Sequence, residues 1–226
     1  MPNSTNLFYQ CDNPTCQLRF PGIEGSPRWN RCPVCRSTIH VVAERITASE
    51  AQDLPVPSKL SYVGCILDNV RSVWNVGSIF RTADGLGINK LYLCGITPTP
   101  DNSKLSKTAL GAEVSIAWEK INNGVILARK LKDQGTQLWA LENSPGAEDL
   151  FLLESELLVS PQVLVIGNEI SGIDPGIIEM SDRTISIPMM GKKKSFNVSV
   201  AFGIAASYLL YRQIVSQGSL NMFPHT

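Results

Sequence analysis

The segment from Arg183 to Tyr211 constrains the fold of this chain more than any other part of its sequence. It begins with a β-branched run, Thr184–Ile187, which predicts a strand that ends at Pro188 because proline cannot donate a hydrogen bond to a neighbouring strand. A loop with three successive lysines follows, and then a helix that is apolar on almost every side, which predicts that the helix is buried. The loop is therefore expected at the carboxyl end of a strand, where open α/β sheets bind their ligands.

The helix predicted after this loop begins near Ser195 and Asn197, and Ser195 is expected to cap its first turn. A plainer alternative is an ordinary strand–helix unit whose lysine-rich loop is only a solvated surface. The apolar positions that predict burial on most sides are Val198, Val200, Ala201, Ile204, Ala205, Leu209 and Leu210.

Further strands and helices alternate along the chain before this segment. The near-continuous apolar run Tyr62–Leu67 is typical of a central strand in a parallel sheet. A helix from Asn75 to about Leu86 is expected to be capped by Asn75 and ended by Gly85 and Gly87. Alternation of this kind predicts an α/β domain with a mostly parallel sheet. The other expected elements are strands at Lys90–Cys94, Gln137–Leu141 and Val163–Ile166 and a helix at Asn123–Asp133.

Four cysteines near the start of the chain have the spacing of a metal site. Cys11 and Cys16 form one pair, and Cys32 and Cys35 form a second pair after fifteen intervening residues. Two short-spaced pairs are typical of a structural zinc site with four thiolates, which leaves no open position for catalysis. Two disulfides or unrelated thiols are the alternatives, and a reducing compartment disfavours disulfides. With four cysteines available, His40 is expected to be a bystander.

Charge and hydropathy limit the possible classes of function. The 226 residues carry a formal net charge of zero, which argues against a general nucleic-acid binder but permits a local basic patch. Arg28 and Arg31 flank Trp29 in the cysteine segment, where they are expected to contact RNA or simply to form a solvated face. No apolar run reaches the length of a bilayer and no signal peptide precedes the first cysteine, so a cytoplasmic protein is expected.

The chain is expected to divide into two folded parts joined by a proline-containing linker. The predicted parts are a zinc-ribbon-like module at 1–42, a linker at 43–59, the α/β domain at 60–218 and a tail at 219–226.

Three segments of the α/β domain occur in the order and with the character of a known set of motifs. They are Asn75–Gly87, Val163–Ile173 and Ile187–Ala201. Together they resemble the motifs of the SpoU (TrmH-type) RNA 2′-O-methyltransferases of the SPOUT superfamily, and Leu110–Glu113 resembles the loop between the first two. The resemblance covers about 60–217. It implies a sheet with a C-terminal deep trefoil knot, a homodimer with its active site at the subunit interface, and S-adenosylmethionine as the cofactor.

The resemblance also implies roles for particular residues. Arg81 is expected to act as a clamp on the RNA phosphate and on the developing alkoxide, because a guanidinium stays protonated and is a poor general base. The alternative is a surface ion pair between Arg81 and Asp84. The other catalytic candidates are Asn75, Glu169, Ser195 and Asn197; the cofactor-binding candidates are Leu141, Gly167, Ile187, Met189, Phe196 and Val198; and the RNA-binding lysines are Lys192, Lys193 and Lys194.

Several of these candidates have a second interpretation. Glu169 is expected to hold Arg81, to face the cofactor or to anchor its loop, and Ser195 and Asn197 either contact ligand or cap the helix. Two positions depart from the family pattern, because Phe196 replaces the usual leucine and Ile170 a frequent glycine. With Glu142, Leu141 is expected to close one side of the cofactor pocket.

The sequence therefore predicts an S-adenosylmethionine-dependent RNA ribose 2′-O-methyltransferase with a structural zinc. We favour tRNA over rRNA as substrate, because rRNA-acting relatives commonly carry a different N-terminal RNA-binding domain. A non-catalytic RNA-binding protein with the same fold is one alternative, and a zinc-ribbon transcription factor with an α/β regulatory domain is another.

Overall fold

The chain folds into two compact units, Met1–Asp53 and Leu54–Thr226. The computed structural model describes residues 6–26, 30–44, 62–153 and 162–216. Arg28, much of the predicted linker and the predicted tail at 219–226 lie outside the described residues.

The smaller unit is a three-stranded antiparallel sheet with the order β2-β1-β3. Its strands are β1 (Asn6–Cys11), β2 (Arg19–Ile23) and β3 (Ile39–Glu44). Its core is small: among the described residues of this unit the buried side chains are those of Cys11 and Cys32, and the Tyr9 ring stacks on that of Phe20. A sheet of this size rarely folds without a metal or a disulfide.

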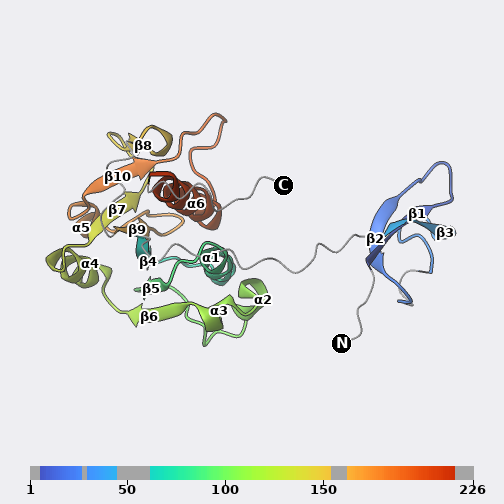
Figure 1. Cartoon of the computed structure of the whole chain (residues 1–226), viewed down its shortest axis with the longest axis horizontal. Helices are drawn as coiled ribbons and strands as arrows, with labels where there is room; N and C mark the ends of the chain where they lie inside the picture. The colour runs from blue at the N-terminus through green and yellow to red at the C-terminus, as the bar shows by residue number, and fades with distance from the viewer. Residues whose placement is uncertain (1–5, 27–29, 45–61, 154–161, 217–226) are drawn as a thin grey trace. The chain divides into compact units, whose positions relative to one another are not determined.

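The larger unit is built on a seven-stranded sheet with the order β6-β5-β4-β9-β7-β10-β8, and its described strand pairs are all parallel (Figure 1). This architecture confirms the predicted α/β class and the mostly parallel sheet. The strands are β4 (Tyr62–Asp68), β5 (Lys90–Cys94), β6 (Ala117–Ile121), β7 (Gln137–Leu141), β8 (Glu148–Asp149), β9 (Gln162–Ile166) and β10 (Arg183–Ser186).

Helices cover both faces of this sheet. On one face α1 and α6 share a core with α2 and α3, and on the other α4 and α5 pack against a second core (Figure 1). Successive residues of β4 alternate between the two cores, because side chains of a strand point to opposite faces. The helices are α1 (Val73–Gly85), α2 (Ser106–Ala109), α3 (Ala112–Ser115), α4 (Gly124–Asp133), α5 (Pro175–Ile178) and α6 (Val198–Ser216), with a 3₁₀ turn η2 (Leu150–Leu152).

Helix α1 begins earlier than the sequence predicts. Its N-cap is Ser72, whose hydroxyl accepts a hydrogen bond from the backbone N–H of Asn75. The prediction that Asn75 caps this helix is therefore wrong, and its side chain is free for other contacts. The predicted end is confirmed, since the helix stops at Gly85 and Gly87 has a positive φ of 69°.

Helix α6 is less buried than predicted. Phe202, Ala205 and Leu209 are buried against the sheet, but Val200 and Tyr211 are 48% and 52% exposed. The prediction of burial on most sides is wrong because the helix packs on one face of a single sheet and keeps an apolar outer side. By length and composition Val198–Val215 could cross a membrane, contrary to the sequence prediction, although core helices pass the same test.

Two glycines of α1 give a matched test of this packing. A Cβ atom on Gly77 would lie 2.0 Å from the Thr108 hydroxyl and 2.7 Å from the Leu105 carbonyl, whereas one on Gly85 would meet nothing within 4 Å. We expect Gly77→Ala to lower the free energy of unfolding by about 1–3 kcal/mol through overpacking. Gly85→Ala should leave it unchanged or raise it by less than about 1 kcal/mol. Urea unfolding of both variants measures this, and equal effects would contradict the close α1–α2 contact.

Candidate functional site

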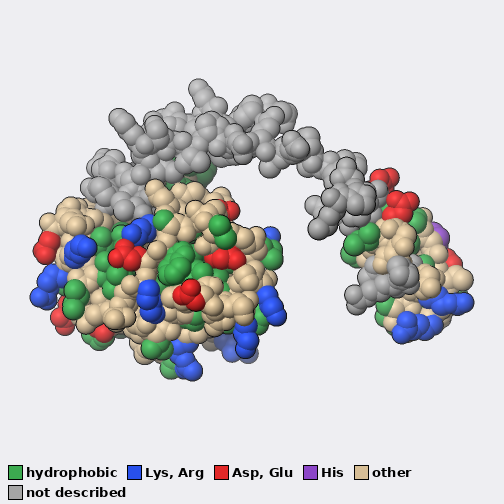
Figure 2. All heavy atoms as spheres, turned by 90° about the horizontal axis from the view of Figure 1, so that it is seen from below, with side chains coloured by type: hydrophobic (Ala, Val, Ile, Leu, Met, Phe, Trp, Pro, Cys, Tyr) green, Lys and Arg blue, Asp and Glu red, His purple; other side chains and the backbone are tan. Residues whose placement is uncertain are grey.

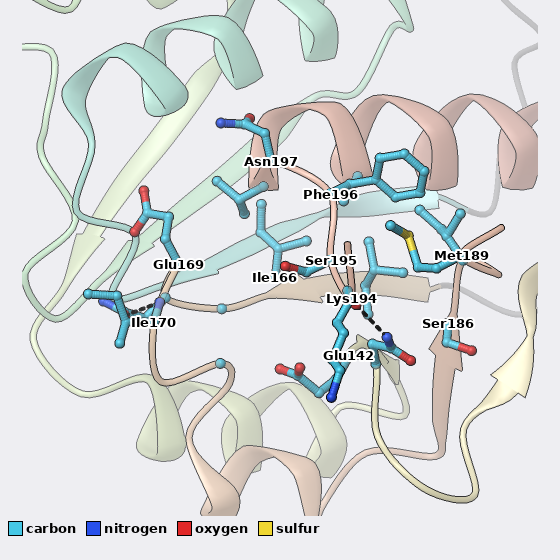
Figure 3. A pocket seen from close by; sticks show the side chains of 18 residues that line it. Glu142, Ile166, Glu169, Ile170, Ser186, Met189, Lys194, Ser195, Phe196 and Asn197 are labelled. Atoms are coloured by element: carbon cyan, nitrogen blue, oxygen red, sulfur yellow. Dashed lines mark hydrogen bonds between the residues drawn. The ribbon is translucent and has the colours of Figure 1, made fainter. Parts of the chain in front are cut away.

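A cavity of about 340 Å³ lies at the carboxyl ends of β7, β9 and β10, beside the start of α6 (Figure 3). The cavity therefore lies at the carboxyl ends of the strands, where the loop after the last strand is predicted to lie. All six predicted cofactor-binding residues line it, and so do Glu169, Ser195 and Asn197. Its lining is Leu141, Glu142, Asn143, Ile166, Gly167, Asn168, Glu169, Ile170, Gly172, Ser186, Ile187, Met189, Lys194, Ser195, Phe196, Asn197, Val198 and Ala201.

One wall of the cavity is a tight turn after β9. Asn168 and Gly172 exchange backbone hydrogen bonds of 3.0 Å, and the Asn168 side-chain oxygen accepts from the backbone N–H of Ile170 and Ser171. Gly167 must be glycine here, because a Cβ would lie 2.3 Å from the backbone of Gly172. The turn is thus fixed from within, and it presents Ile170 with 81% of its surface exposed.

Glu169 ties this turn to the start of α1. Its two carboxylate oxygens accept from the backbone N–H groups of Arg71 and Ser72, at 2.9 and 3.1 Å, and from the side-chain amide of Asn75 at 2.9 Å. Of the three roles considered for Glu169, the described contacts show the anchoring of a loop. The two oxygens bind α1 and its preceding residues, and Arg81 is not among their partners.

Asn75 extends the same network to α6. Its side-chain oxygen accepts from the side-chain amide of Asn197 at 3.1 Å, and the Asn197 oxygen caps α6 by accepting from the N–H of Ser199 at 2.9 Å. Asn197 rather than Ser195 is therefore the cap, so the prediction for Ser195 is wrong. Asn75, Glu169 and Asn197 join three distant segments at one side of the cavity (Figure 3 labels the last two).

Hydrogen bonding decides the charge state of Glu169. Partial burial alone would raise the pKa of Glu169, but the hydrogen bonds from Arg71, Asn75 and Ser72 outweigh it and hold the pKa below its ordinary value. The side chain is therefore an acceptor at neutral pH and is suited to fixing geometry rather than to supplying a proton.

Arg81 does not line the cavity of its own chain. It is exposed on α1, six residues beyond Asn75, and the described residues offer it no hydrogen bond or ion pair. The alternative of an ion pair with Asp84 is not seen, because the Asp84 carboxylate accepts from the Ser115 hydroxyl instead. Arg81 is thus an uncommitted cation on the outer surface.

The basic residues divide into two groups. Lys194 lines the cavity, whereas Lys192 and Lys193 are exposed outside its lining. Asn143 was not singled out from the sequence, yet its side-chain amide donates to the Lys194 carbonyl at 2.6 Å and holds the loop. Its position directly after Leu141 and Glu142 was the available signal. In the smaller unit Arg31 donates to the Arg36 carbonyl at 3.2 Å.

The four N-terminal cysteines converge in the smaller unit. Their sulfur atoms all lie within 4.8 Å of one another, with Cys11 and Cys35 at 3.3 Å and Cys16 and Cys32 at 3.8 Å, and all four are free thiols. His40 is outside the cluster and pairs with Asp12. A zinc ion bound tetrahedrally at about 2.3 Å holds its sulfurs about 3.8 Å apart, so the cluster fits this ion.

Thiols this close cannot all ionise unless a cation lies between them. Burial raises the pKa of Cys11 to about 12, while hydrogen bonds from Ser37 lower the pKa of Cys35 to about 6. The alternative of two disulfides is not seen, although two of the sulfur pairs are near neighbours. The cluster has the ligand number and chemistry of a structural metal site.

A parallel sheet with a cavity at its strand ends, lined by apolar and charged side chains, defines an α/β protein with a candidate site for a small ligand. The chain belongs to the SpoU rRNA Methylase family, whose model matches residues 63–207.

Individual relatives agree with this assignment. A tRNA (guanosine(18)-2′-O)-methyltransferase of Aquifex aeolicus is 34% identical over 61% of this chain and 63% of its own length. A 23S rRNA (guanosine-2′-O-)-methyltransferase of Photorhabdus laumondii is 31% identical over 73% of this chain and 67% of its own. The chain spans 52 to 67% of the length of the curated relatives that it matches here.

Solved structures show the same fold. The A. aeolicus TrmH/SpoU tRNA modifying enzyme superposes with a TM-score of 0.60 and 29% identity, covering 72% of this chain and 79% of that one. An AdoMet-bound rRNA methyltransferase from Sinorhizobium meliloti has a TM-score of 0.60 and 26% identity, and the match covers 69% of this chain and 56% of that one.

Replacing the central carboxylate tests the network. The pKa of Glu169 is lowered on folding, so its stabilisation is present above the ordinary glutamate pKa of about 4.3 and is lost as the pH falls through the lower folded value. We expect Glu169→Gln to lower the free energy of unfolding by about 0.5–1 kcal/mol near pH 7, after allowance for solvent screening, and by less near pH 4.

Urea unfolding at the two pH values measures this difference. Glu179→Gln is the matched control, because Glu179 is exposed and lies outside the network. A Glu169→Gln effect that is equal at both pH values would show that the carboxylate charge does not support the network.

Proposed function

We propose that this protein is an S-adenosylmethionine-dependent methyltransferase that modifies a ribose 2′-hydroxyl of a structured RNA. The observation that carries the proposal is the network of Asn75, Glu169 and Asn197, which joins one residue from each of the three motif segments beside the cavity that Glu169 and Asn197 line. Relatives named for 2′-O-methylation of tRNA and of 23S rRNA support it. We take tRNA as the substrate to test first.

The cavity suits this cofactor. Leu141, Ile187, Met189, Phe196 and Val198 offer an apolar lining for an adenosyl group, and charged and amide side chains offer partners for its polar parts. S-adenosylmethionine supplies the activated methyl group, so the protein has to bind the cofactor, orient the ribose hydroxyl and exclude water. An AdoMet-bound rRNA methyltransferase at 26% identity supports the same choice.

The chain's own residues can then be given roles. Asn75, Glu169 and Asn197 hold the turn and the two helix starts in a fixed geometry, which positions the target hydroxyl. The Ser195 hydroxyl lines the cavity and has no hydrogen-bond partner among the described residues, so it is available to the ribose or the cofactor. Arg81, a permanent cation, stabilises the developing alkoxide or the adjacent phosphate.

This role of Arg81 requires a second copy of the chain. Arg81 does not line its own cavity, and the outer sides of the neighbouring helices α1 and α6 expose Trp74, Val200 and Tyr211 at 48%, 48% and 52%. Aromatic and aliphatic side chains of this kind are typical of the centre of an interface. We therefore propose a homodimer in which Arg81 of one subunit serves the cavity of the other.

A trefoil knot is proposed for the C-terminal part. The segment between β10 and α6 is held from two sides, by Asn143 at the Lys194 carbonyl and by Asn75 at Asn197. Strand β10 pairs beyond β7, while α6 returns to pack on α1. The segment between β10 and α6 passes between these two anchors, and this path supports its threading through a preceding loop.

RNA contact is assigned to two basic regions. The face of the larger unit in Figure 2 carries Lys and Arg side chains mixed with acidic ones, which agrees with the net charge of zero and favours a local patch over a general one. We assign phosphate contacts to Lys192 and Lys193 beside the cavity and to Arg28 and Arg31 of the smaller unit. A zinc ion bound by reduced cysteines fits a cytoplasmic protein.

The test is methyl transfer from tritiated cofactor to tRNA and to rRNA, with the modified nucleotide mapped. We expect transfer by the wild-type protein and at least a hundredfold loss in both Arg81→Ala and Asn197→Ala. If Arg81 acts on the partner's cavity, mixing the two inactive variants rebuilds one intact site in each mixed dimer and restores about a quarter of the activity.

Three outcomes of this test would contradict parts of the proposal. No restoration on mixing would mean that Arg81 serves the cavity of its own subunit or has no part in catalysis. RNA binding without any methyl transfer would contradict the proposed activity and favour a non-catalytic RNA-binding protein, and preferential binding to duplex DNA would favour a transcription factor.

The metal assignment has its own test. We expect about one zinc ion per chain, and we expect Cys32→Ser to lose it and to unfold the smaller unit, because the metal supplies folding energy that the small core lacks. Metal analysis and limited proteolysis measure both effects. Cys65→Ser, at a buried thiol of the larger unit, is the control and should retain the zinc. Unchanged zinc content in Cys32→Ser would contradict the site.

A further inference from the structure

Most polar side chains around the cavity are already committed to other protein groups. Asn168 bonds its own turn and the Asn69 carbonyl, Glu169 and Asn197 belong to the network, and the Asn143 amide holds the Lys194 carbonyl. Among the described residues, the charged side-chain atoms that line the cavity and remain uncommitted are one oxygen of Glu142 and the ammonium of Lys194.

Glu142 is held in place by one of its two oxygens. Its Oε2 accepts from the backbone N–H of Ile173 at 3.1 Å, and its own backbone N–H donates to the Ile185 carbonyl at 3.0 Å. Gly172 makes room for the carboxylate, because a Cβ there would lie 2.5 Å from Oε2 and 3.5 Å from Oε1. The side chain is thus fixed, and Oε1 remains available to a ligand.

Lys194 approaches the same region from the loop before α6. Its carbonyl is anchored by Asn143, the residue that follows Glu142, so the two charged residues are tied to one another through a single hydrogen bond of 2.6 Å. Figure 3 shows both side chains ending on the same side of the pocket. They do not form an ion pair with each other. The cavity therefore presents one negative and one positive group, each without an opposite partner among the described residues.

We propose that Glu142 and Lys194 bind the amino-acid end of the cofactor, with the Glu142 carboxylate accepting from the ligand's α-ammonium and the Lys194 ammonium donating to its α-carboxylate. This subsite rests on the proposed function, because it assumes S-adenosylmethionine as the ligand.

A zwitterion is the ligand group that matches both charges. A ligand phosphate would be attracted by Lys194 but repelled by Glu142, and a ribose hydroxyl needs an acceptor but no cation. Hydrogen bonds in which both groups are charged are shorter and stronger than neutral ones, so two of them can fix a flexible amino-acid chain. Glu169 does not take this role, because both of its carboxylate oxygens already accept hydrogen bonds from protein groups.

Three ligands distinguish contact with the amino-acid end from contact with the rest of the cofactor. S-adenosylmethionine and S-adenosylhomocysteine both carry the amino-acid end, whereas methylthioadenosine lacks it but keeps the adenosine. We expect Glu142→Gln and Lys194→Met each to weaken the first two by about tenfold and to leave methylthioadenosine within about twofold, as measured by titration calorimetry. In Glu142→Gln the new amide oxygen can still accept from the Ile173 N–H, and Lys193→Met, outside the cavity lining, is the matched control.

Each other outcome overturns the subsite. Equal weakening of all three ligands would assign Glu142 to the ribose or to the shape of the pocket, and weakening of S-adenosylmethionine alone would assign it to the sulfonium charge. Unchanged binding by both variants would remove these residues from ligand contact. Unaltered methylthioadenosine binding also shows that the variants are folded. Wild-type protein that binds none of the three would instead overturn the proposed function, and the subsite with it.

Discussion

The site is held together by the carboxylate of Glu169. A carboxylate has several acceptor positions and no donor, so it can satisfy backbone N–H groups at a helix start and a side-chain amide at once. Glu169 does this for Arg71, Ser72 and Asn75, and Asn75 passes the connection on to Asn197. Two helix starts that lie 122 positions apart in the chain, at Asn75 and Asn197, are thereby fixed to one another and to the turn after β9. Without the Glu169 carboxylate, the segments that form the walls of the cavity would no longer be bonded to one another.

The two units achieve stability by different means. The larger one buries two apolar cores on the faces of a seven-stranded sheet, whereas the smaller one has three short strands and two buried cysteines. In the smaller unit, four sulfur atoms converge within 4.8 Å of one another. A metal bound there would link its segments where apolar side chains are too few to do so. Folding costs conformational entropy in both units. Buried apolar side chains offset this cost in the larger unit, and the clustered thiols are suited to offset it in the smaller unit by binding a metal.

Much of this organisation could be predicted from the sequence, because strand patterns and cysteine spacing are local signals. The strands at Lys90–Cys94 and Gln137–Leu141 have the predicted bounds, and the four cysteines gather as their spacing indicated. The errors arise where partners are distant in the chain. Asn75 looked like a helix cap because its true partners, Glu169 and Asn197, are about a hundred residues away. The exposed outer side of α6 was equally invisible, since periodicity cannot distinguish a sheet-facing side from one left for another subunit.

The strand order has a consequence for synthesis on the ribosome. Strand β9 lies between β4 and β7, so until residues beyond 162 have emerged β4 is paired only with β5 and β7 has no strand partner. Hydrogen bonding of β4 and β7 then depends on a late insertion, which is a slow and aggregation-exposed step in folding. A ribosome that stalls before β9 would release a fragment in which β4 has an open edge and β7 is unpaired, and such strands are prone to pair with other chains.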